Sequence, residues 1–368
     1  MRNFDVVIVG AGTAGLMLAR ELSNVKKRTL VLDRKKHLLD FSFNTLASFI
    51  NLEDFNLSDN VVAQKINKIT FHSNKVKSSL KANLYTLDKK KVHEELIESI
   101  NDKYVTFQLN TNIKSIIADD NQNFTTVVDQ NKTAYTAKLF VDASGTNGVL
   151  SKKVGLIPKK TQLATGVEYN VKYKGNCKEI FLLIGEMYQG GYGWIFPLQN
   201  DRAIIGFGTF DENIVKDLKN RLHQILEIPM IKNLVEKDND KAEGGSIPIT
   251  PVLENFVVQN LVCVGDSVSQ VNPIVGEGYK FIFESAIMAS KAIIKTLKSE
   301  NLEHLKEYEV LWKNRFSKNY KRSKRSQERF FKYSQNNFVM DFIVFLSKLI
   351  SSKRSIRSLS GEYGLEEK

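Results

Sequence analysis

Cysteine is scarce in this sequence: Cys177 and Cys263 are the only two among 368 residues. Two cysteines give no disulfide framework, and Cys263 lies in the apolar run 261–264, which is typical of a buried, unreactive thiol. The five histidines have no spacing that suits a metal. We therefore expect a protein without a metal site that is held together by its hydrophobic core.

Long apolar runs are absent as well. No run approaches the roughly 20 apolar residues that cross a bilayer. A strand is predicted to begin at Phe4, where a secretory signal would place its apolar region. These features predict a cytoplasmic protein. With 42% hydrophobic residues, the chain is long enough for two packed domains.

Acidic residues are nearly missing from residues 313–332, which hold nine Lys or Arg against one acid, Glu328. An apolar stretch, residues 338–350, follows this basic run. The two stretches can lie at the cytoplasmic face of a membrane, with the cations on anionic headgroups, or pack on the body with a solvated basic face. Both interpretations stay open. No motif accompanies the basic run that would favour nucleic acid as a partner.

The opening of the chain predicts a βαβ unit. Residues 5–9 and 28–32 are short apolar runs typical of buried parallel strands, and residues 16–24 between them are helical in pattern. Residues 164–173 and 202–207 alternate in polarity, which predicts an antiparallel sheet. The fold class is therefore α/β, with a Rossmann-type domain, an antiparallel-sheet substrate domain and a helical C-terminal tail.

The domain boundaries follow from where these patterns change. We expect a discontinuous nucleotide-binding domain and a substrate-binding domain inserted into it, followed by a basic helical region. The first is assigned residues 1–44, 86–155 and 255–300, the second 45–85 and 156–254, and the third 301–368.

A glycine loop joins the first predicted strand to its helix. Gly10 permits the tight turn, Gly12 lets the backbone approach a pyrophosphate, and Gly15 allows the helix to pack closely on the strand. Asp33 ends the second strand, where its carboxylate can accept hydrogen bonds from a ribose diol. Because a strand, a helix and an acid accompany the loop, the pattern predicts dinucleotide binding.

A second glycine-rich segment distinguishes FAD from NAD. A strand ending in Gly265-Asp266 can place a carboxylate near the flavin ribitol. The run 272–278 opens a long predicted helix, and its backbone amides can face the negative charge of a reduced flavin. Together with the first loop and with residues 142–145, this segment indicates FAD.

These three segments, in this order, resemble the FAD-dependent oxidoreductases of the para-hydroxybenzoate hydroxylase type. Tyr192-Gly-Trp194-Ile-Phe196-Pro197, followed by Gly206-Phe-Gly208, resembles the aromatic motif of the geranylgeranyl reductase family. The resemblance implies that Tyr192 and Trp194 act at the catalytic centre, and that the substrate contacts Tyr192, Trp194, Phe196 and Pro197. The residues assigned to FAD are Gly10, Gly12, Thr13, Ala14, Gly15, Asp33, Arg34, Lys89, Ile113, Ala143, Gly145, Gly265, Asp266, Pro273, Gly276, Glu277 and Gly278.

The function that the resemblance implies is reduction of carbon–carbon double bonds in an isoprenoid or related lipid by hydride transfer from reduced flavin. A polyprenyl chain needs an apolar, aromatic-lined groove, which agrees with the aromatic motif. Since the single dinucleotide loop is assigned to FAD, reduction of the flavin requires an external electron donor such as NAD(P)H or ferredoxin. Peripheral membrane contact through the C-terminal tail would suit such a substrate.

The sequence also departs from the family. Residues 41–44 read Phe-Ser-Phe-Asn where members often carry a Cys-Gly pair, and Lys89 replaces an arginine that reaches the cofactor. Two alternatives therefore stay open. One is a flavin-dependent hydroxylase or halogenase, for which Lys75 and Lys77 lie at a suggestive chain position. The other is a flavin- or lipid-binding protein without turnover.

Overall fold

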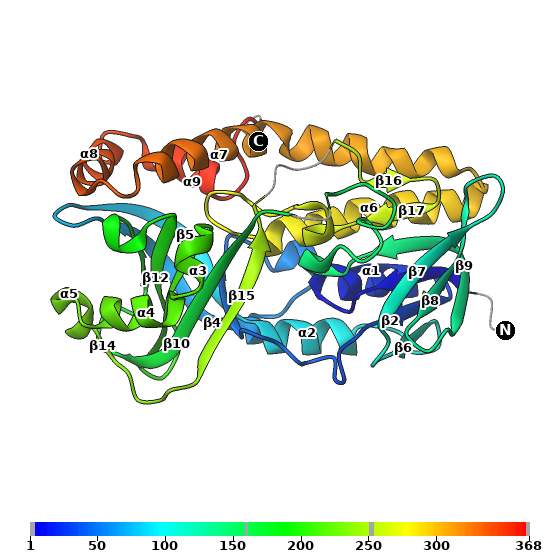
Figure 1. Cartoon of the computed structure of the whole chain (residues 1–368), viewed down its shortest axis with the longest axis horizontal. Helices are drawn as coiled ribbons and strands as arrows, with labels where there is room; N and C mark the ends of the chain where they lie inside the picture. The colour runs from blue at the N-terminus through cyan, green and yellow to red at the C-terminus, as the bar shows by residue number, and fades with distance from the viewer. Residues whose placement is uncertain (1–3, 159–160, 250–253, 366–368) are drawn as a thin grey trace.

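The computed structural model describes residues 4–158, 161–249 and 254–365. Two sheets lie side by side along the long axis of the molecule, and helices cover them from above (Figure 1). The predicted fold class is confirmed, because a Rossmann-type parallel sheet, a second, mostly antiparallel sheet and a helical C-terminal region are all present. The domain boundaries stay a prediction.

The first sheet lies in the half of the chain that the sequence predicts to bind a nucleotide. Its central strands are parallel. The central strand β1 has no polar residue other than Asp5, which suits burial on both faces. The strand order is β16-β17-β9-β1-β2-β6, and β7 and β8 extend β9 as an antiparallel hairpin. The strands are β1 Phe4–Val9, β2 Thr29–Leu32, β6 Val105–Gln108, β7 Ile113–Ala118, β8 Phe124–Asp129, β9 Ala134–Asp142, β16 Val257–Val258 and β17 Leu261–Cys263.

The second sheet is antiparallel except for the pair β11–β4. Its order is β14-β10-β13-β12-β11-β4-β5-β3, with β15 paired to β10. The strands are β3 Thr45–Ser48, β4 Val62–His72, β5 Lys77–Asp88, β10 Leu163–Tyr173, β11 Glu179–Leu183, β12 Gly191–Pro197, β13 Arg202–Thr209, β14 Val235–Glu236 and β15 Ala242–Pro248. The long hairpin β4–β5 was not predicted, because its lysines and asparagines interrupt the apolar alternation.

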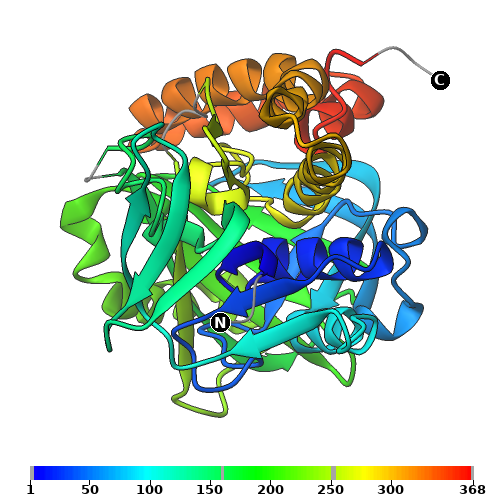
Figure 2. The ribbon, with the colours of Figure 1, turned by 90° about the vertical axis from the view of Figure 1, so that its right-hand side faces the viewer.

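Helices pack in layers over the two sheets. In Figures 1 and 2, α1 lies next to the first sheet, α6 packs on α1, and the long α7 lies outermost. The helix α7 reaches from the first sheet to the second, where α8 and α9 follow it (Figure 1). The helices are α1 Thr13–Asn24, α2 Lys89–Glu98, α3 Glu212–Val215, α4 Leu218–Leu226, α5 Pro229–Lys232, α6 Tyr279–Ser299, α7 Lys306–Tyr333, α8 Asn337–Ser347 and α9 Ser352–Leu359.

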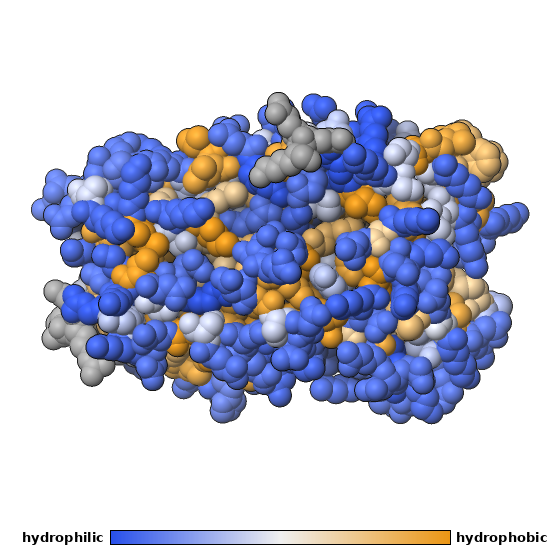
Figure 3. Space-filling view, turned by 180° about the vertical axis from the view of Figure 1, so that it is seen from behind, coloured by the Kyte–Doolittle hydropathy of each residue, from blue (hydrophilic) through white to orange (hydrophobic). Residues whose placement is uncertain are grey.

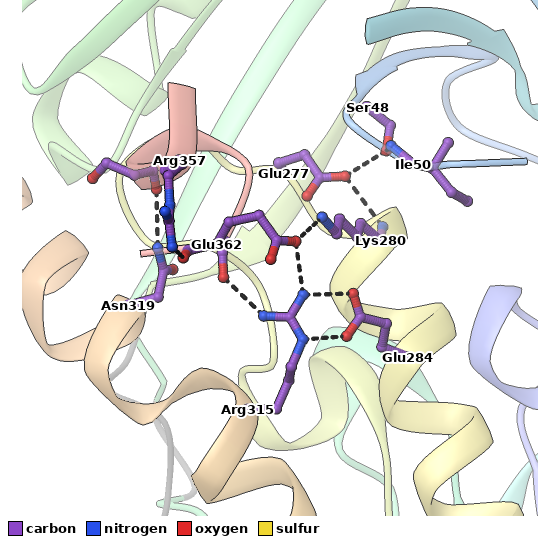
Figure 4. A network of polar contacts seen from close by, with 11 residues as sticks. Ser48, Ile50, Glu277, Lys280, Glu284, Arg315, Asn319, Arg357 and Glu362 are labelled. Carbon is purple, nitrogen blue, oxygen red and sulfur yellow. Dashed lines mark hydrogen bonds and ion pairs between the residues drawn. The ribbon is translucent and has the colours of Figure 1, made fainter. Parts of the chain in front are cut away.

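A polar network fastens the C-terminal segment to α6 and α7. Arg315 of α7 donates two hydrogen bonds to Glu284 of α6 (2.7 and 2.9 Å) and one to Glu362 (2.9 Å), and Lys280 also pairs with Glu362 (Figure 4). Glu277, just before α6, accepts a hydrogen bond from the Ser48 hydroxyl at 2.6 Å. Since the Lys280 amide also donates to Glu277, the network connects the end of the described chain to β3, the edge strand of the second sheet.

Candidate active site

A cavity of about 300 Å³, lined by charged and polar as well as apolar residues, opens at the carboxyl ends of β1, β2 and β9, where doubly wound folds bind their ligands. Most of the residues that the sequence assigned to FAD line this cavity. They are Gly10, Gly12, Thr13, Ala14, Asp33, Arg34, Lys89, Ile113, Ala143, Gly145 and Asp266. We call this space the nucleotide cavity.

The three glycines of the first loop have different roles in the structure. Gly10 has a φ of +111°, and a Cβ added to it would lie 2.3 Å from the Ala143 carbonyl oxygen. A Cβ on Gly15 would lie 1.9 Å from the Gly10 oxygen, so both positions require glycine for packing. A Cβ on Gly12 would meet no described atom within 4 Å. Gly12 therefore leaves room on the ligand side of the loop.

The carboxylate of Asp33 holds the loop from the end of β2. Its Oδ2 accepts a hydrogen bond from the Ala11 amide at 2.6 Å, and its Oδ1 accepts one from the Lys35 amide at 2.8 Å. A carboxylate has about four acceptor positions, so each oxygen can accept a further hydrogen bond from a ribose hydroxyl. Asp33 thus positions the loop and still faces the nucleotide cavity.

Two groups of opposite charge face the far end of the nucleotide cavity. Burial raises the pKa of Asp266 to about 6, while the nearby Lys89 favours its charged form. Burial and the neighbouring Lys35 lower the pKa of Lys89 to about 8, and Asp266 opposes this shift. The Oδ1 atom of Asp266 is buried and has no hydrogen-bond partner among the described residues. Such an unpaired acceptor suits a ligand that donates hydrogen bonds.

His93 also lines the nucleotide cavity, and the sequence analysis did not identify it. Its Nε2 lies 3.1 Å from the Thr13 hydroxyl. Burial, with Lys89 and Lys35 nearby, holds its pKa well below the usual value, so the ring is neutral. The only signal in the sequence was its spacing, since His93 lies one helical turn after Lys89 on α2.

A second cavity, of about 240 Å³, lies on the second sheet and is lined mainly by apolar and aromatic side chains. We call it the apolar cavity. Phe43 and Ile247 line both cavities, so the two spaces meet at these side chains. Phe43 belongs to the segment that departs from the family motif, and the Lys89 Nζ lies 3.8 Å from the centre of its ring. The structure therefore places this departure where the cavities join.

The residues 192–196 alternate across β12 and present three aromatic rings to the apolar cavity. Tyr192, Trp194 and Phe196 all line it. The Trp194 and Phe196 rings stack with their centres 6.1 Å apart. Pro197 is buried and lies on the opposite face of the strand, so the structure does not place it with the three predicted substrate residues.

Glycines on the neighbouring strands form a bare floor beneath Trp194. A Cβ on Gly206 would lie 2.4 Å from the indole, and Cβ atoms on Gly166 and Gly208 would lie 2.9 and 3.2 Å from it. The Gly-x-Gly part of the motif is thereby explained, because the indole can lie flat only on a sheet surface without side chains. The indole reaches over Gly206 to the next strand, where its Nε1 donates a hydrogen bond to Glu168 Oε2 at 3.1 Å.

The segment before α6 lies at the apolar cavity. Pro273, Gly276 and Glu277 were assigned to FAD, but they line the apolar cavity. Among the residues described, neither cavity has Gly15, Gly265 or Gly278 in its lining. Gly276 does approach the junction, because a Cβ on it would lie 2.8 Å from the Ile247 side chain. Burial raises the pKa of Glu277 to about 7, although Ser48 donates a hydrogen bond to it.

A third cavity, of about 250 Å³, lies between the second sheet and α7, α8 and α9. It shares Leu182, Tyr192, Ile274, Val275 and Leu359 with the apolar cavity. Arg322 and Arg354 are its charged lining residues. Three adjoining spaces therefore run from the glycine loop to the C-terminal helices.

The described residues hold no cluster of three or more His, Cys, Asp or Glu side chains that could bind a metal. None of their helices combines the length and the hydrophobicity that crossing a membrane requires. The nucleotide cavity, by contrast, fits FAD. It has an open glycine at the loop, an acid at the end of β2 and an unpaired buried acceptor at Asp266.

Comparison with known proteins gives consistent matches. The protein family described as lycopene cyclase protein matches residues 5–356. A digeranylgeranylglycerophospholipid reductase of Methanococcus aeolicus is 26% identical over 342 residues, covering 86% of this chain and 83% of that protein. The fold is similar to that of a geranylgeranyl bacteriochlorophyll reductase-like protein from Thermoplasma acidophilum, with a TM-score of 0.85 and 19% identity, covering 99% of this chain and 98% of the other. A probable FAD-dependent monooxygenase from Pseudomonas aeruginosa has a TM-score of 0.73 and 16% identity, covering 94% of this chain and all of that one. The resemblance to geranylgeranyl reductases is confirmed.

Proposed function

Since the chain belongs to the lycopene cyclase protein family, we propose that it is an FAD-dependent oxidoreductase that reduces carbon–carbon double bonds of an isoprenoid lipid. The observation that carries this proposal is the junction at Phe43 and Ile247, where the nucleotide cavity with its dinucleotide loop meets an aromatic, apolar one. The relatives named as reductases of geranylgeranyl lipids support the substrate class.

The protein residues would hold the coenzyme at both ends of the nucleotide cavity. Gly12 and the N-terminus of α1 would hold the pyrophosphate, Asp33 a ribose, and Asp266 would accept a hydrogen bond from a polyol hydroxyl. Bound FAD, once reduced by an external donor such as NAD(P)H or ferredoxin, supplies a hydride. The aromatic rings of Tyr192, Trp194 and Phe196 would hold the apolar chain and exclude water.

The third cavity extends the apolar cavity, which agrees with a long substrate. A polyprenyl chain is long, and the apolar cavity continues past Tyr192 and Val275 toward the C-terminal helices. Arg322 and Arg354 at this end can pair with an anionic headgroup. In this arrangement the chain lies across the sheet and the headgroup stays at the helices.

Peripheral contact with a membrane is part of the proposal. Met340 and Val344 of α8 pack on the body, while Phe338 and Leu349 are 80% and 75% exposed, and Phe342 and Phe345 are also exposed. Seen from behind, an apolar patch covers the upper right corner, where this view places α8 (Figure 3). Basic residues of α7 precede this patch in the chain, and they would face anionic lipid headgroups.

Oxygen chemistry is the competing function. The fold similarity to a monooxygenase keeps a hydroxylase reaction within reach of the scaffold. A halogenase reaction is disfavoured, because Lys75 and Lys77 lie exposed at the β4–β5 turn beside Asp341 of α8 and do not line the apolar cavity.

One experiment separates these functions. The purified protein is loaded with FAD, reduced without oxygen, and mixed with digeranylgeranylglycerophospholipid in detergent micelles. Reoxidation of the flavin with a saturated bond formed in the lipid supports the reductase. If the flavin stays reduced with lipid alone and is reoxidised only when oxygen is then admitted, through a long-lived peroxide, the monooxygenase is favoured. Failure to bind FAD would refute both. For the membrane contact, serine at Phe338, Phe342 and Phe345 should weaken binding to anionic vesicles without changing the flavin content.

A further inference from the structure

Reduction of a carbon–carbon double bond requires a proton as well as a hydride. The proton must come from a group that reaches the apolar chain, since the aromatic lining excludes water. Three described residues that line the apolar cavity carry an ionisable proton: Glu168, Tyr192 and Glu277. The structure distinguishes them by what each already binds.

The Tyr192 hydroxyl already donates a hydrogen bond within the protein. It donates its hydrogen bond to the Val275 carbonyl oxygen at 2.5 Å. Burial raises the pKa of Tyr192 above the ordinary value, so loss of its proton is disfavoured further. The sequence analysis placed Tyr192 at the catalytic centre, and its geometry suits a wall of the cavity better than a proton donor.

Glu277 is held as an acceptor at the start of α6. Its Oε1 accepts hydrogen bonds from the Ser48 hydroxyl at 2.6 Å and from the Lys280 amide at 3.2 Å. Burial raises the pKa of Glu277 to about 7, and the hydrogen bonds from Ser48 and the Lys280 amide, with the charge of Lys280, oppose this shift. The Oε2 atom of Glu277 is buried without a partner among the described residues, as is Oε1 of Glu168. Two donors hold the other oxygen of Glu277, however, against one for Glu168, so these contacts favour its carboxylate form and fix it between β3 and α6.

Glu168 occupies a different position, on the floor of the cavity. The strand register places Trp194, Gly206, Glu168 and Glu243 in one row across β12, β13, β10 and β15. Gly206 has no side chain, so the Trp194 indole reaches over it to Glu168 Oε2. The residue is 6% exposed, and its other oxygen, Oε1, is buried without a hydrogen-bond partner among the described residues.

The surroundings of Glu168 favour its protonated form. Burial raises its pKa to about 8; the hydrogen bond from Trp194 and the charge of Lys89 oppose the shift, and Glu243 on the next strand adds to it. Since Oε2 accepts from the indole, the acidic proton belongs on Oε1. The group is therefore a neutral acid near pH 7, held beside the aromatic rings that would contact the substrate.

We propose that Glu168 is the catalytic acid that delivers the proton to the double bond, an assignment that rests on the proposed reductase function. The π bond of the substrate breaks: one carbon would gain a hydride, which carries the two electrons, from bound reduced FAD, and the other carbon gains the proton from Glu168 Oε1. The coenzyme is oxidised, the lipid is reduced, and Glu168 is left as a carboxylate. It regains a proton from water after the product leaves.

The test uses FAD-loaded protein that has been reduced without oxygen and mixed with digeranylgeranylglycerophospholipid in detergent micelles. The variant Glu168→Gln keeps the size of the side chain and an oxygen that accepts from Trp194, but it has no acidic proton. We expect its single-turnover reoxidation by lipid to be about 10²- to 10⁴-fold slower than that of the wild type. Reoxidation by ferricyanide, which needs no proton, should be unchanged and so reports an intact fold and coenzyme.

Two further readouts separate an acid from a structural residue. Glu168→Asp should recover part of the lipid-dependent rate. In the FAD-free protein, the infrared carbonyl band of a buried carboxylic acid should titrate near pH 8 in the wild type, and this component should be lost in Glu168→Gln. Lys89 on α2 and Glu243 on β15 face Glu168 and stay unchanged in both proteins, so the comparison removes their contribution.

The outcomes are distinct. If the wild type does not pass electrons to the lipid, the reductase function fails and this assignment fails with it. If the wild type reduces the lipid and Glu168→Gln does so equally fast, only the assignment of Glu168 is overturned. A large loss in Glu277→Gln with Glu168→Gln unaffected would likewise overturn it and move the role to Glu277.

Discussion

The hydroxyl of Tyr192 donates a hydrogen bond to the carbonyl oxygen of Val275 at 2.5 Å. This contact joins β12 to the segment before α6, at the boundary of the apolar and third cavities, because both residues line both spaces. It makes Tyr192 a structural link between the sheet and the helical layer, with its ring free to contact a substrate.

Replacing Tyr192 by phenylalanine should therefore affect stability more than chemistry. The variant leaves the Val275 carbonyl without its donor, which costs about 1–3 kcal/mol of unfolding free energy. Urea unfolding measures this loss, and Tyr333→Phe, at a position that is 44% exposed, serves as the control. A hundredfold slower reoxidation by lipid, with FAD still bound, would instead show that the hydroxyl takes part in the reaction.

Alanine at Gly12 should weaken coenzyme binding without unfolding the protein. Its φ of −87° suits any residue, and a Cβ there meets no described atom within 4 Å, so the FAD-free protein should keep its unfolding midpoint. The added methyl group lies where the pyrophosphate would approach, and we expect at least about tenfold weaker binding, equivalent to ~1.4 kcal/mol. Titration with FAD checks this, and unchanged affinity would contradict the assignment of the loop.

Alanine at Gly206 should have the opposite effect: it should lower the stability of the protein and leave FAD binding unchanged. The new Cβ would lie 2.4 Å from the Trp194 indole, so the ring must move off the sheet, and its hydrogen bond to Glu168 would be lost. Overpacking of this kind costs about 1–3 kcal/mol. FAD affinity should stay unchanged while tryptophan fluorescence shifts and reoxidation by lipid slows. An unshifted spectrum would mean that the indole does not depend on the glycine floor.

The raised pKa of Glu168 predicts a pH-dependent stability of the FAD-free protein. Because the folded pKa of about 8 exceeds the ordinary 4.5, the folded state binds more protons between these values, and stability falls as the pH rises through this window. Glu168→Gln removes up to one proton from this difference, or ~1.4 kcal/mol per pH unit. Urea unfolding between pH 5 and pH 8 should give a flatter profile for the variant.

Lys89 does not confuse this comparison. Its pKa is lowered to about 8, so its contribution to stability is gained as the pH rises above that value, outside the window. Asp266 and Glu277 also have raised pKa values, so their contributions to the stability of the protein fall as the pH rises, like that of Glu168. These contributions are equal in the wild type and the variant. Parallel profiles for the wild type and the variant would show that Glu168 is ionised throughout.

Lysine at Arg315 should loosen the C-terminal segment. Arg315 donates to both oxygens of Glu284 and to Glu362, and a lysine cannot reproduce this fork. We expect a loss on the order of 2 kcal/mol, measured by urea unfolding. The exposed pair Lys65–Asp59 provides the control, since Lys65→Met should leave the midpoint unchanged. Equal midpoints for both variants would argue against the network.

The nucleotide-binding half was largely predictable from the sequence. Its strands are short apolar runs buried on both faces, and the residues between Gly10 and Asp33 have fixed spacings that the dinucleotide site requires. The prediction began the first helix three residues late, because Thr13 to Gly15 carry no apolar periodicity although they are helical. This part of the fold is encoded locally.

The relation between the two cavities could not be predicted in the same way. Glu168 contacts Trp194 across Gly206 because three strands pair in one register, and neither the register nor the bare glycine surface is visible from spacing alone. The segment before α6 was assigned to the coenzyme from its glycines, yet Pro273 and Glu277 line the apolar cavity. Their positions depend on how α6 packs on α1 and α7, which is a tertiary property.

The pairing of β17 with β9 has a consequence for biosynthesis. Both strands belong to the first sheet, but six of the nine strands of the second sheet, β10 to β15, lie between them in the chain. On a ribosome, the edge of β9 at residues 140–142 therefore waits without its partner until the second sheet has been made. Open edges of this kind invite association between nascent chains, and the long sequence separation slows closure. Yield in a cell should thus depend on translation rate and chaperone supply.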